Sequence, residues 1–202
     1  MITKKELIDT TLSAIIDSHQ TYLKWSGNEW LRNAPEYLLT VKIAEKLANI
    51  NKNKFITLED NVEKTLDSAG AKGQGKISSK IRANGRYDIV LWWAKGDPRA
   101  IIEVKHRVYK FANIKEDIIR ICETLKRKTF QSSIKYGLMA FYMSNSNKNN
   151  AKDTLFNQIN NLFKKTENIV FNNGLSVEKH TKEIYCENDQ YVYSSIVYLI
   201  KR

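Results

Sequence analysis

Proline, cysteine and long apolar runs are all scarce in this chain. The 202 residues include only two prolines and two cysteines. Because no proline-rich linker divides the chain, we expect a single domain over residues 1–202. Cys122 and Cys186 stand far apart and outside any CxxC pair, which argues against a disulfide scaffold or a structural zinc site.

Apolar residues never approach the run of ~20 that a membrane helix needs. The N-terminal segment alternates charged and apolar residues, whereas a signal peptide has a continuous apolar centre. We therefore expect a soluble, cytoplasmic protein with no membrane partner.

Acidic residues are also few. The 22 Asp and Glu residues face 33 Lys and Arg, which gives a net charge of +11 and a pI near 9.5. This balance favours a polyanionic partner such as nucleic acid, although charge alone does not separate DNA, RNA and an anionic membrane.

Hydrophobic periodicity predicts the order of the elements. Helices are expected over residues 3–24, from Asn33 to about Ile50, from Asn113 onward and from Asn150 onward, each with a capping residue at its start. Strands are expected over 55–60, 86–94, 99–107 and 136–143, followed by C-terminal strands of unassigned order. This order predicts an α/β fold with one mixed sheet flanked by helices.

Two acids are expected to meet on the central hairpin. If its turn is centred between Lys95 and Gly96, then Asp88 faces Glu103 and Arg86 faces Lys105. Like charges in such positions are destabilising. A Mg²⁺ ion reverses this effect, because two carboxylates can share it, and a neighbouring ammonium group can then offset charge on a phosphate.

The segments GRYDIV (85–90) and EVK (103–105) together resemble the PD-(D/E)xK nuclease superfamily. The resemblance covers about residues 34–143 and implies a restriction-endonuclease-like core of order αβββαβ, with residues 1–33 and 144–202 as additions, including an extra N-terminal helix and a C-terminal helix and strands. It also implies phosphodiester hydrolysis with Mg²⁺ or Mn²⁺, with Asp88 and Glu103 as metal ligands and Lys105 as the catalytic lysine. Tyr87 stands where the family name has proline.

Glu36 is the candidate for a further catalytic acid, because such families often place one on the first core helix. Its helical position puts it on the side of Ile43 and Leu47, toward the sheet. Equally, Glu36 lies three residues after Asn33 and could complete a capping box.

Basic residues cluster before and after the hairpin. Residues 70–87 contain four glycines and five Lys or Arg but no acid, which is typical of a mobile or ligand-ordered connection. The third helix adds further cations, among them Arg120, which either hold a nucleic-acid backbone or form an ordinary charged outer face. The candidates for binding nucleic acid are Lys72, Lys76, Lys80, Arg82, Arg86, Arg107 and Lys110.

Other interpretations compete with an active site. The hairpin charges could form a solvated face in which Asp88 pairs with Lys105 and Arg86 with Glu103, at about 0–1 kcal/mol per pair. The apolar Val90, which continues the same strand face, favours a packed surface instead.

The leading hypothesis is a metal-dependent nuclease that acts on DNA rather than RNA, and family analogy suggests a restriction, mobile-element or phage-defence setting. A homodimer or a partner subunit is left open. The alternatives are a catalytically inactive nucleic-acid-binding module or subunit of the same fold, and a basic protein that docks on an acidic partner.

Overall fold

The computed structural model describes residues 2–73, 76–127, 130–146, 150–188 and 191–202. Within these residues the strands form one seven-stranded sheet of order β1-β2-β3-β4-β7-β5, with β6 paired to β7. The β3–β4 pair is parallel and the others are antiparallel, so the sheet is mixed. The strands are β1 (Lys54–Asn61), β2 (Arg86–Trp93), β3 (Pro98–Lys105), β4 (Tyr136–Asn145), β5 (Ser176–Thr181), β6 (Tyr185–Asn188) and β7 (Tyr191–Lys201).

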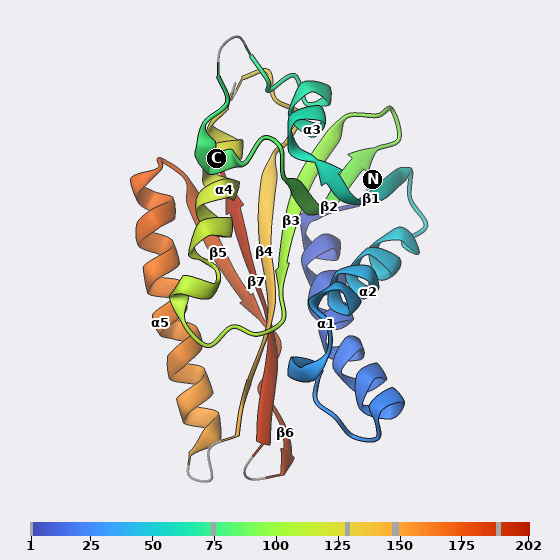
Figure 1. Cartoon of the computed structure of the whole chain (residues 1–202), viewed down its shortest axis with the longest axis vertical. Coiled ribbons are helices and arrows are strands. Elements are labelled where there is room, and N and C mark those ends of the chain that lie inside the picture. Colours follow the sequence, from blue (N-terminus) through green and yellow to red (C-terminus); the bar gives the residue numbers. More distant parts are fainter. Residues whose placement is uncertain (1, 74–75, 128–129, 147–149, 189–190) are drawn as a thin grey trace.

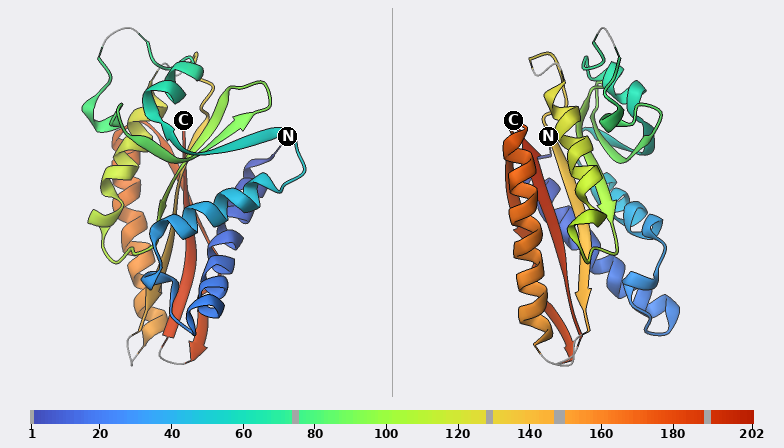
Figure 2. Two further views of the ribbon diagram at one scale, coloured as in Figure 1. Left: turned by 45° about the vertical axis from the view of Figure 1, so that its right-hand side comes forward. Right: turned by 60° about the vertical axis from the view of Figure 1, so that its left-hand side comes forward.

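Helices cover both faces of this sheet, as Figures 1 and 2 show. One face packs against α1 and α2, and the other against α4 and α5, with α3 near one end. The five α-helices of the described chain are α1 (Lys4–Ser26), α2 (Glu36–Ala48), α3 (Val62–Ser68), α4 (Lys115–Lys126) and α5 (Ala151–Asn172). Short 3-10 turns lie at η1 (Leu31–Asn33), η2 (Ser79–Ile81) and η3 (Phe111–Asn113).

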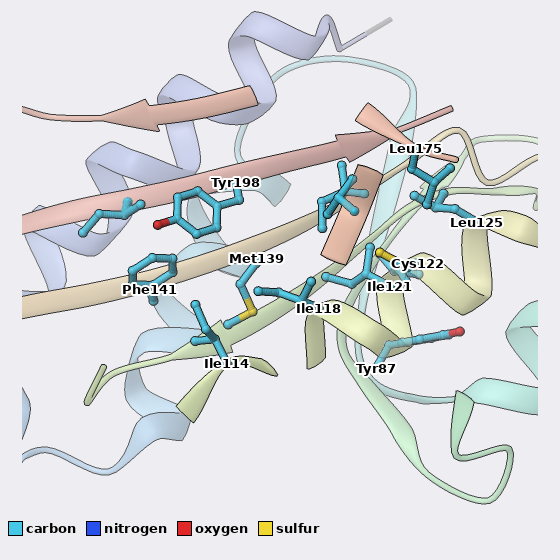
Figure 3. Close-up of a cluster of buried hydrophobic side chains, with 14 of the residues drawn as sticks. Tyr87, Ile114, Ile118, Ile121, Cys122, Leu125, Met139, Phe141, Leu175 and Tyr198 are labelled. Atoms are coloured by element: carbon cyan, nitrogen blue, oxygen red, sulfur yellow. The ribbon is translucent and has the colours of Figure 1, made fainter. Parts of the chain in front are cut away.

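Alternation along the strands separates the core into two layers. Val90 and Ile101 pack on the side of α4 and α5, whereas Ile89 and Ile102 pack on the side of α1 and α2. Figure 3 shows the first layer, in which side chains of α4 meet those of the central strands. The expected α/β fold with one mixed sheet is therefore confirmed.

A glycine on β4 sets how close α4 lies to the sheet. A Cβ atom at Gly137 would stand only 2.3 Å from Ile121 Cγ2 of α4. Any larger residue would push this part of the helix outward. The neighbouring residue on the helix is Arg120, so this close approach also fixes where its side chain reaches the sheet.

The start of α1 is predicted correctly, whereas two other helix starts are not. Thr3 and Glu6 form the expected capping box. Asn33 lies inside η1 and donates to Glu29 Oε2 at 2.5 Å, and the N-cap of α2 is Pro35. Asn113 ends η3 and accepts from the backbone of Lys110 at 3.1 Å, so it does not cap α4. Asparagine serves either role, since its side chain bonds to nearby groups in turns as readily as to the backbone at helix ends.

The hairpin has the predicted register over part of its length. Ile89 pairs with Ile102 and Val90 with Ile101, and a bulge follows at Leu91 and Trp92. The element order α2, β1, β2, β3, α4, β4 follows the expected sequence, with α3 inserted after β1. The C-terminal strands β5, β6 and β7 extend the same sheet. Among the described residues, no helix combines the length and apolar character that crossing a membrane requires.

Candidate active site at the end of strand β3

The predicted acids and lysine lie where β3 ends. Pairing between β2 and β3 runs from Ile89–Ile102 toward the turn, so Asp88 and Glu103 come just beyond it. The carboxylate of Asp88 turns to the β3 backbone, where Oδ2 accepts a hydrogen bond from Val104 N at 2.7 Å. Neither expected facing pair, Asp88 with Glu103 or Arg86 with Lys105, is part of the β2–β3 pairing, which ends at Ile89–Ile102.

Glu103 is held at the bottom of the site by an arginine from α4. Its side chain is 1% exposed, and Oε2 accepts from Nη2 of Arg120. The guanidinium also donates to the carbonyl of Arg86 at 3.0 Å and stands over the Tyr87 ring. The other carboxylate oxygen, Glu103 Oε1, is buried and has no hydrogen-bond partner within the described chain.

Arg120 thus corrects two expectations. As one of the cations of the third helix it was a candidate for contact with a nucleic-acid backbone, but it is buried and points toward the sheet. The surface pairing of Arg86 with Glu103 is likewise wrong, since Glu103 bonds to Arg120 in the core.

Lys105 stands closer to solvent and has two acidic neighbours. Its Nζ donates to Glu36 Oε1 at 2.9 Å and lies 3.7 Å from Asp117 Oδ2. The Glu36 carboxylate also lies 3.2 Å from His106 Nδ1. Glu36 is the first residue of α2 and reaches across to β3, so the expectation that it points toward the sheet is confirmed. The alternative, a capping box with Asn33, is wrong because the N-cap of α2 is Pro35.

Asp117 is a member of the site that sequence reasoning missed. This buried residue of α4 lies 3.8 Å from Arg120 Nη2 and 3.5 Å from Arg82 Nη1. The sequence contains a signal for it. Asp117, Arg120 and Thr124 recur at helical spacing and so share one side of this helix, beside its apolar stripe. We call the six residues Glu36, Asp88, Glu103, Lys105, Asp117 and Arg120 the β3 charge cluster.

Burial shifts the protonation equilibria of the cluster. Burial raises the pKa of Asp88, although the hydrogen bond from Val104 opposes it. Burial also raises the pKa of Glu103 well above its usual range, despite the charge of Arg120, and Asp88 and Asp117 add to the shift. Two adjacent carboxyl groups are therefore harder to ionise than free side chains, and an additional cation would favour their charged forms.

The pKa values of Glu36 and Lys105 shift in the direction that favours their charged forms. Burial opposes ionisation of Glu36, but hydrogen bonds from His106 and Lys105 prevail and lower its pKa to about 2. Burial likewise works against the charge of Lys105, but the carboxylates of Asp117 and Glu36 raise its pKa overall. Lys105 is thus held as an ammonium group at neutral pH.

The donor set fits a hard divalent cation in part. Among the described residues, no group of three or more His, Cys, Asp or Glu side chains is arranged to hold a metal ion. Mg²⁺, however, is commonly held by one or two carboxylates, with water and substrate phosphate oxygens completing its shell. The partnerless Glu103 Oε1 and the nearby Asp88 carboxylate supply that smaller set.

The predicted nucleic-acid-binding residues differ in their partners. Lys72 is 3.0 Å from Glu63 and Arg82 faces Asp117, so both already have acidic neighbours. Arg107 donates through Nε to the carbonyl of Arg32. Residues 74–75 of the basic connection lie outside the described residues. Six of the candidates are exposed residues, namely Lys76, Lys80, Arg82, Arg86, Arg107 and Lys110, and the side chain of Lys72 is 44% exposed.

Comparisons of this chain with models of protein families, with curated proteins and with solved structures find no match.

Proposed function

We propose that the chain is a metal-dependent nuclease that hydrolyses phosphodiester bonds with Mg²⁺, or with Mn²⁺ in its place, on a restriction-endonuclease-like core. The observation that carries the proposal is the meeting of Glu36, Asp88 and the Glu103–Lys105 segment at one end of β3. Helix α2 and the two strands of the hairpin contribute acids and an ammonium group to one place, and phosphodiester hydrolysis requires such groups together.

Asp88 and Glu103 are the residues that would hold the ion. A bound Mg²⁺ supplies Lewis acidity for the phosphate and lowers the pKa of a bound water. Arg120 keeps Glu103 in place through Oε2, which leaves Oε1 for the ion. Val104 N fixes Asp88 in the same way through Oδ2. Both carboxylates are thereby positioned before any ligand arrives.

Lys105 supplies positive charge beside the reacting phosphate. Glu36 and Asp117 hold its ammonium group from two sides, so little reorganisation is needed when negative charge develops. His106 steadies Glu36 in turn, at 3.2 Å. The side chain of Lys105 remains 28% exposed, which leaves a route from solvent to the amine.

DNA is the proposed polymer, in preference to RNA. The net charge of +11 supports a polyanionic substrate without choosing between the two. The choice of DNA rests on the resemblance to a nuclease superfamily, so parallel assays with a DNA and an RNA of the same sequence belong to the test.

Plasmid cleavage tests the proposal. Supercoiled DNA should be nicked or linearised with Mg²⁺ or Mn²⁺ and left intact with EDTA, and Asp88→Ala and Lys105→Ala should each lower the rate by about 10²-fold or more. Asp97→Ala and Lys95→Ala are matched controls, because this exposed pair lies at the turn of the same hairpin. Equal rates for all four variants, or cleavage in EDTA, would refute the proposed site.

A catalytically inactive nucleic-acid-binding protein is the second candidate. The observation that favours it is the Arg120–Glu103 ion pair, because a guanidinium already compensates one of the two metal-binding carboxylates. This candidate predicts salt-sensitive binding that is indifferent to EDTA, with no cleavage by the purified protein.

A further inference from the structure

The chain that leaves β3 runs beside a hollow that the proposed catalytic residues do not use. After Lys105 it crosses toward α4 alongside the middle of α5 (Figure 1). Arg107 Nε donates to the carbonyl of Arg32, which ties this segment to η1 just before Glu36. The two segments that carry Glu36 and Lys105 therefore both continue into the same neighbourhood.

Two adjoining cavities of about 210 and 180 Å³ lie there and share Tyr109 and Gln158. The larger one is bounded further by Phe111 and by Lys165 of α5. The smaller one reaches Arg32. We call the two together the Tyr109 hollow.

Charge and aromatic surface coincide in the Tyr109 hollow. Arg32, Lys110 and Lys165 contribute three cationic side chains, and none of the described residues that line it is acidic. Tyr109 is 50% exposed. Cations along a groove with an accessible aromatic ring are the usual means of binding a nucleic-acid strand, since phosphates meet the cations and a base stacks on the ring.

We infer that the Tyr109 hollow binds an unpaired stretch of nucleic acid next to the site of cleavage, with a base on Tyr109 and phosphates at Lys110 and Lys165. This inference rests on the proposed action on nucleic acid and narrows its substrate to one with single-stranded character. In a duplex the bases are stacked inside and paired, so their faces cannot reach a tyrosine ring. The cavities are also small, which suits single bases.

Polar side chains complete the match to a base. Gln158 borders both cavities, and Asn161 borders the larger one. Side-chain amides donate and accept hydrogen bonds and therefore tolerate any base edge. The hollow accordingly favours single strands of broad sequence.

Binding in EDTA separates this inference from catalysis. Fluorescence anisotropy would follow a labelled oligothymidylate and a labelled duplex with the full chain. Tyr109→Leu should weaken single-strand binding about tenfold. Lys165→Gln should reduce the slope of log affinity against log salt by about 0.7 in magnitude. Phe171→Leu and Lys164→Gln are matched controls, because they are exposed residues of α5 that do not line the hollow, and both should bind as the wild type does.

Each outcome decides between the two proposals. Loss confined to the Tyr109 and Lys165 variants, and to the single strand, supports the inference even if no plasmid is cut, in which case only the hydrolytic proposal fails. Unchanged binding in both variants, equal weakening of single strand and duplex, or no binding at all overturns the inference, and Asp88-dependent plasmid cleavage would then still support the nuclease. Circular dichroism of each variant confirms that the fold is intact.

Discussion

The β3 charge cluster and the Tyr109 hollow grow from the same two chain segments but use positive charge in opposite ways. In the cluster, Lys105 and Arg120 each lie against carboxylates, and Glu103, Asp117 and Arg120 are buried. The hollow has three cationic side chains, those of Arg32, Lys110 and Lys165. None of the described residues that line it is acidic. Preorganised charge suits a reaction centre, whereas unneutralised charge suits the binding of a polyanion.

The comparison also predicts a difference in what each region contributes to stability. A buried charge whose partner is removed must either be neutralised or stay unpaired in the core. An exposed lysine leaves no such penalty when it is replaced.

The largest expected effect is therefore at Arg120. Arg120→Met removes the partner of the buried Glu103 carboxylate and should lower the free energy of unfolding by about 3–5 kcal/mol, measured by urea denaturation. Lys165→Gln, in the hollow, should change it by less than about 0.5 kcal/mol. Equal small losses of stability in both variants would show that replacing a charge in the cluster costs no more than replacing one on the surface.

A double variant sharpens this result. Because the cost lies in the unpaired carboxylate, adding Glu103→Leu to Arg120→Met should restore much of the lost stability. Additive losses would instead locate the effect in packing, at the contact between Arg120 and the Tyr87 ring.

A smaller effect of opposite sign is expected at Asp88. Burial raises the pKa of this carboxyl group, so the folded state holds its proton more tightly than the unfolded state does, and stability falls as pH rises through the range between the two pKa values. Asp88→Asn should remove that cost and stabilise the protein by up to about 1 kcal/mol at pH 7, while it abolishes cleavage. Thermal unfolding measures the gain.

The control for Asp88→Asn is Asp97→Asn. Asp97 pairs with Lys95 at the exposed turn of the hairpin, so its replacement should give no gain. If Asp88→Asn lowered stability instead, its hydrogen bond from Val104 would outweigh its burial.

The smallest effect concerns pH and Glu36. Its pKa is lowered from 4.5 to about 2, so its contribution to stability is present above about pH 4.5 and is lost as pH falls toward 2. The carboxylate is 38% exposed, and solvent screening limits this contribution to at most about 1 kcal/mol. The difference in unfolding free energy between wild type and Glu36→Gln should shrink over that range, and a difference independent of pH would contradict the ion pair.

Much of the fold could be predicted from the sequence because its signals are local. The apolar stripes, the turn centred between Lys95 and Gly96 and the alternation along β2 and β3 predicted the element order and the register at Ile89–Ile102. The starts of α2 and α4 could not be predicted, because Asn33 and Asn113 bond within turns that look like caps in the sequence.

The meeting of the hairpin residues and Glu36 could be predicted from the sequence, whereas the contribution of α4 to the cluster could not. Asp88, Glu103 and Lys105 follow from strand alternation, but the approach of α4 that brings in Arg120 depends on Gly137, on a different strand. Tyr109, Gln158 and Arg32 come from three separate segments, and no local pattern brings them together.

Anomalous diffraction from a crystal soaked in Mn²⁺ tests the central claim most directly. We predict a peak in contact with the carboxylates of Asp88 and Glu103, and no peak there in Asp88→Asn crystals soaked in the same way. A crystal of cleavage-competent protein without that peak, in which Glu103 still bonds only to Arg120, would contradict the account.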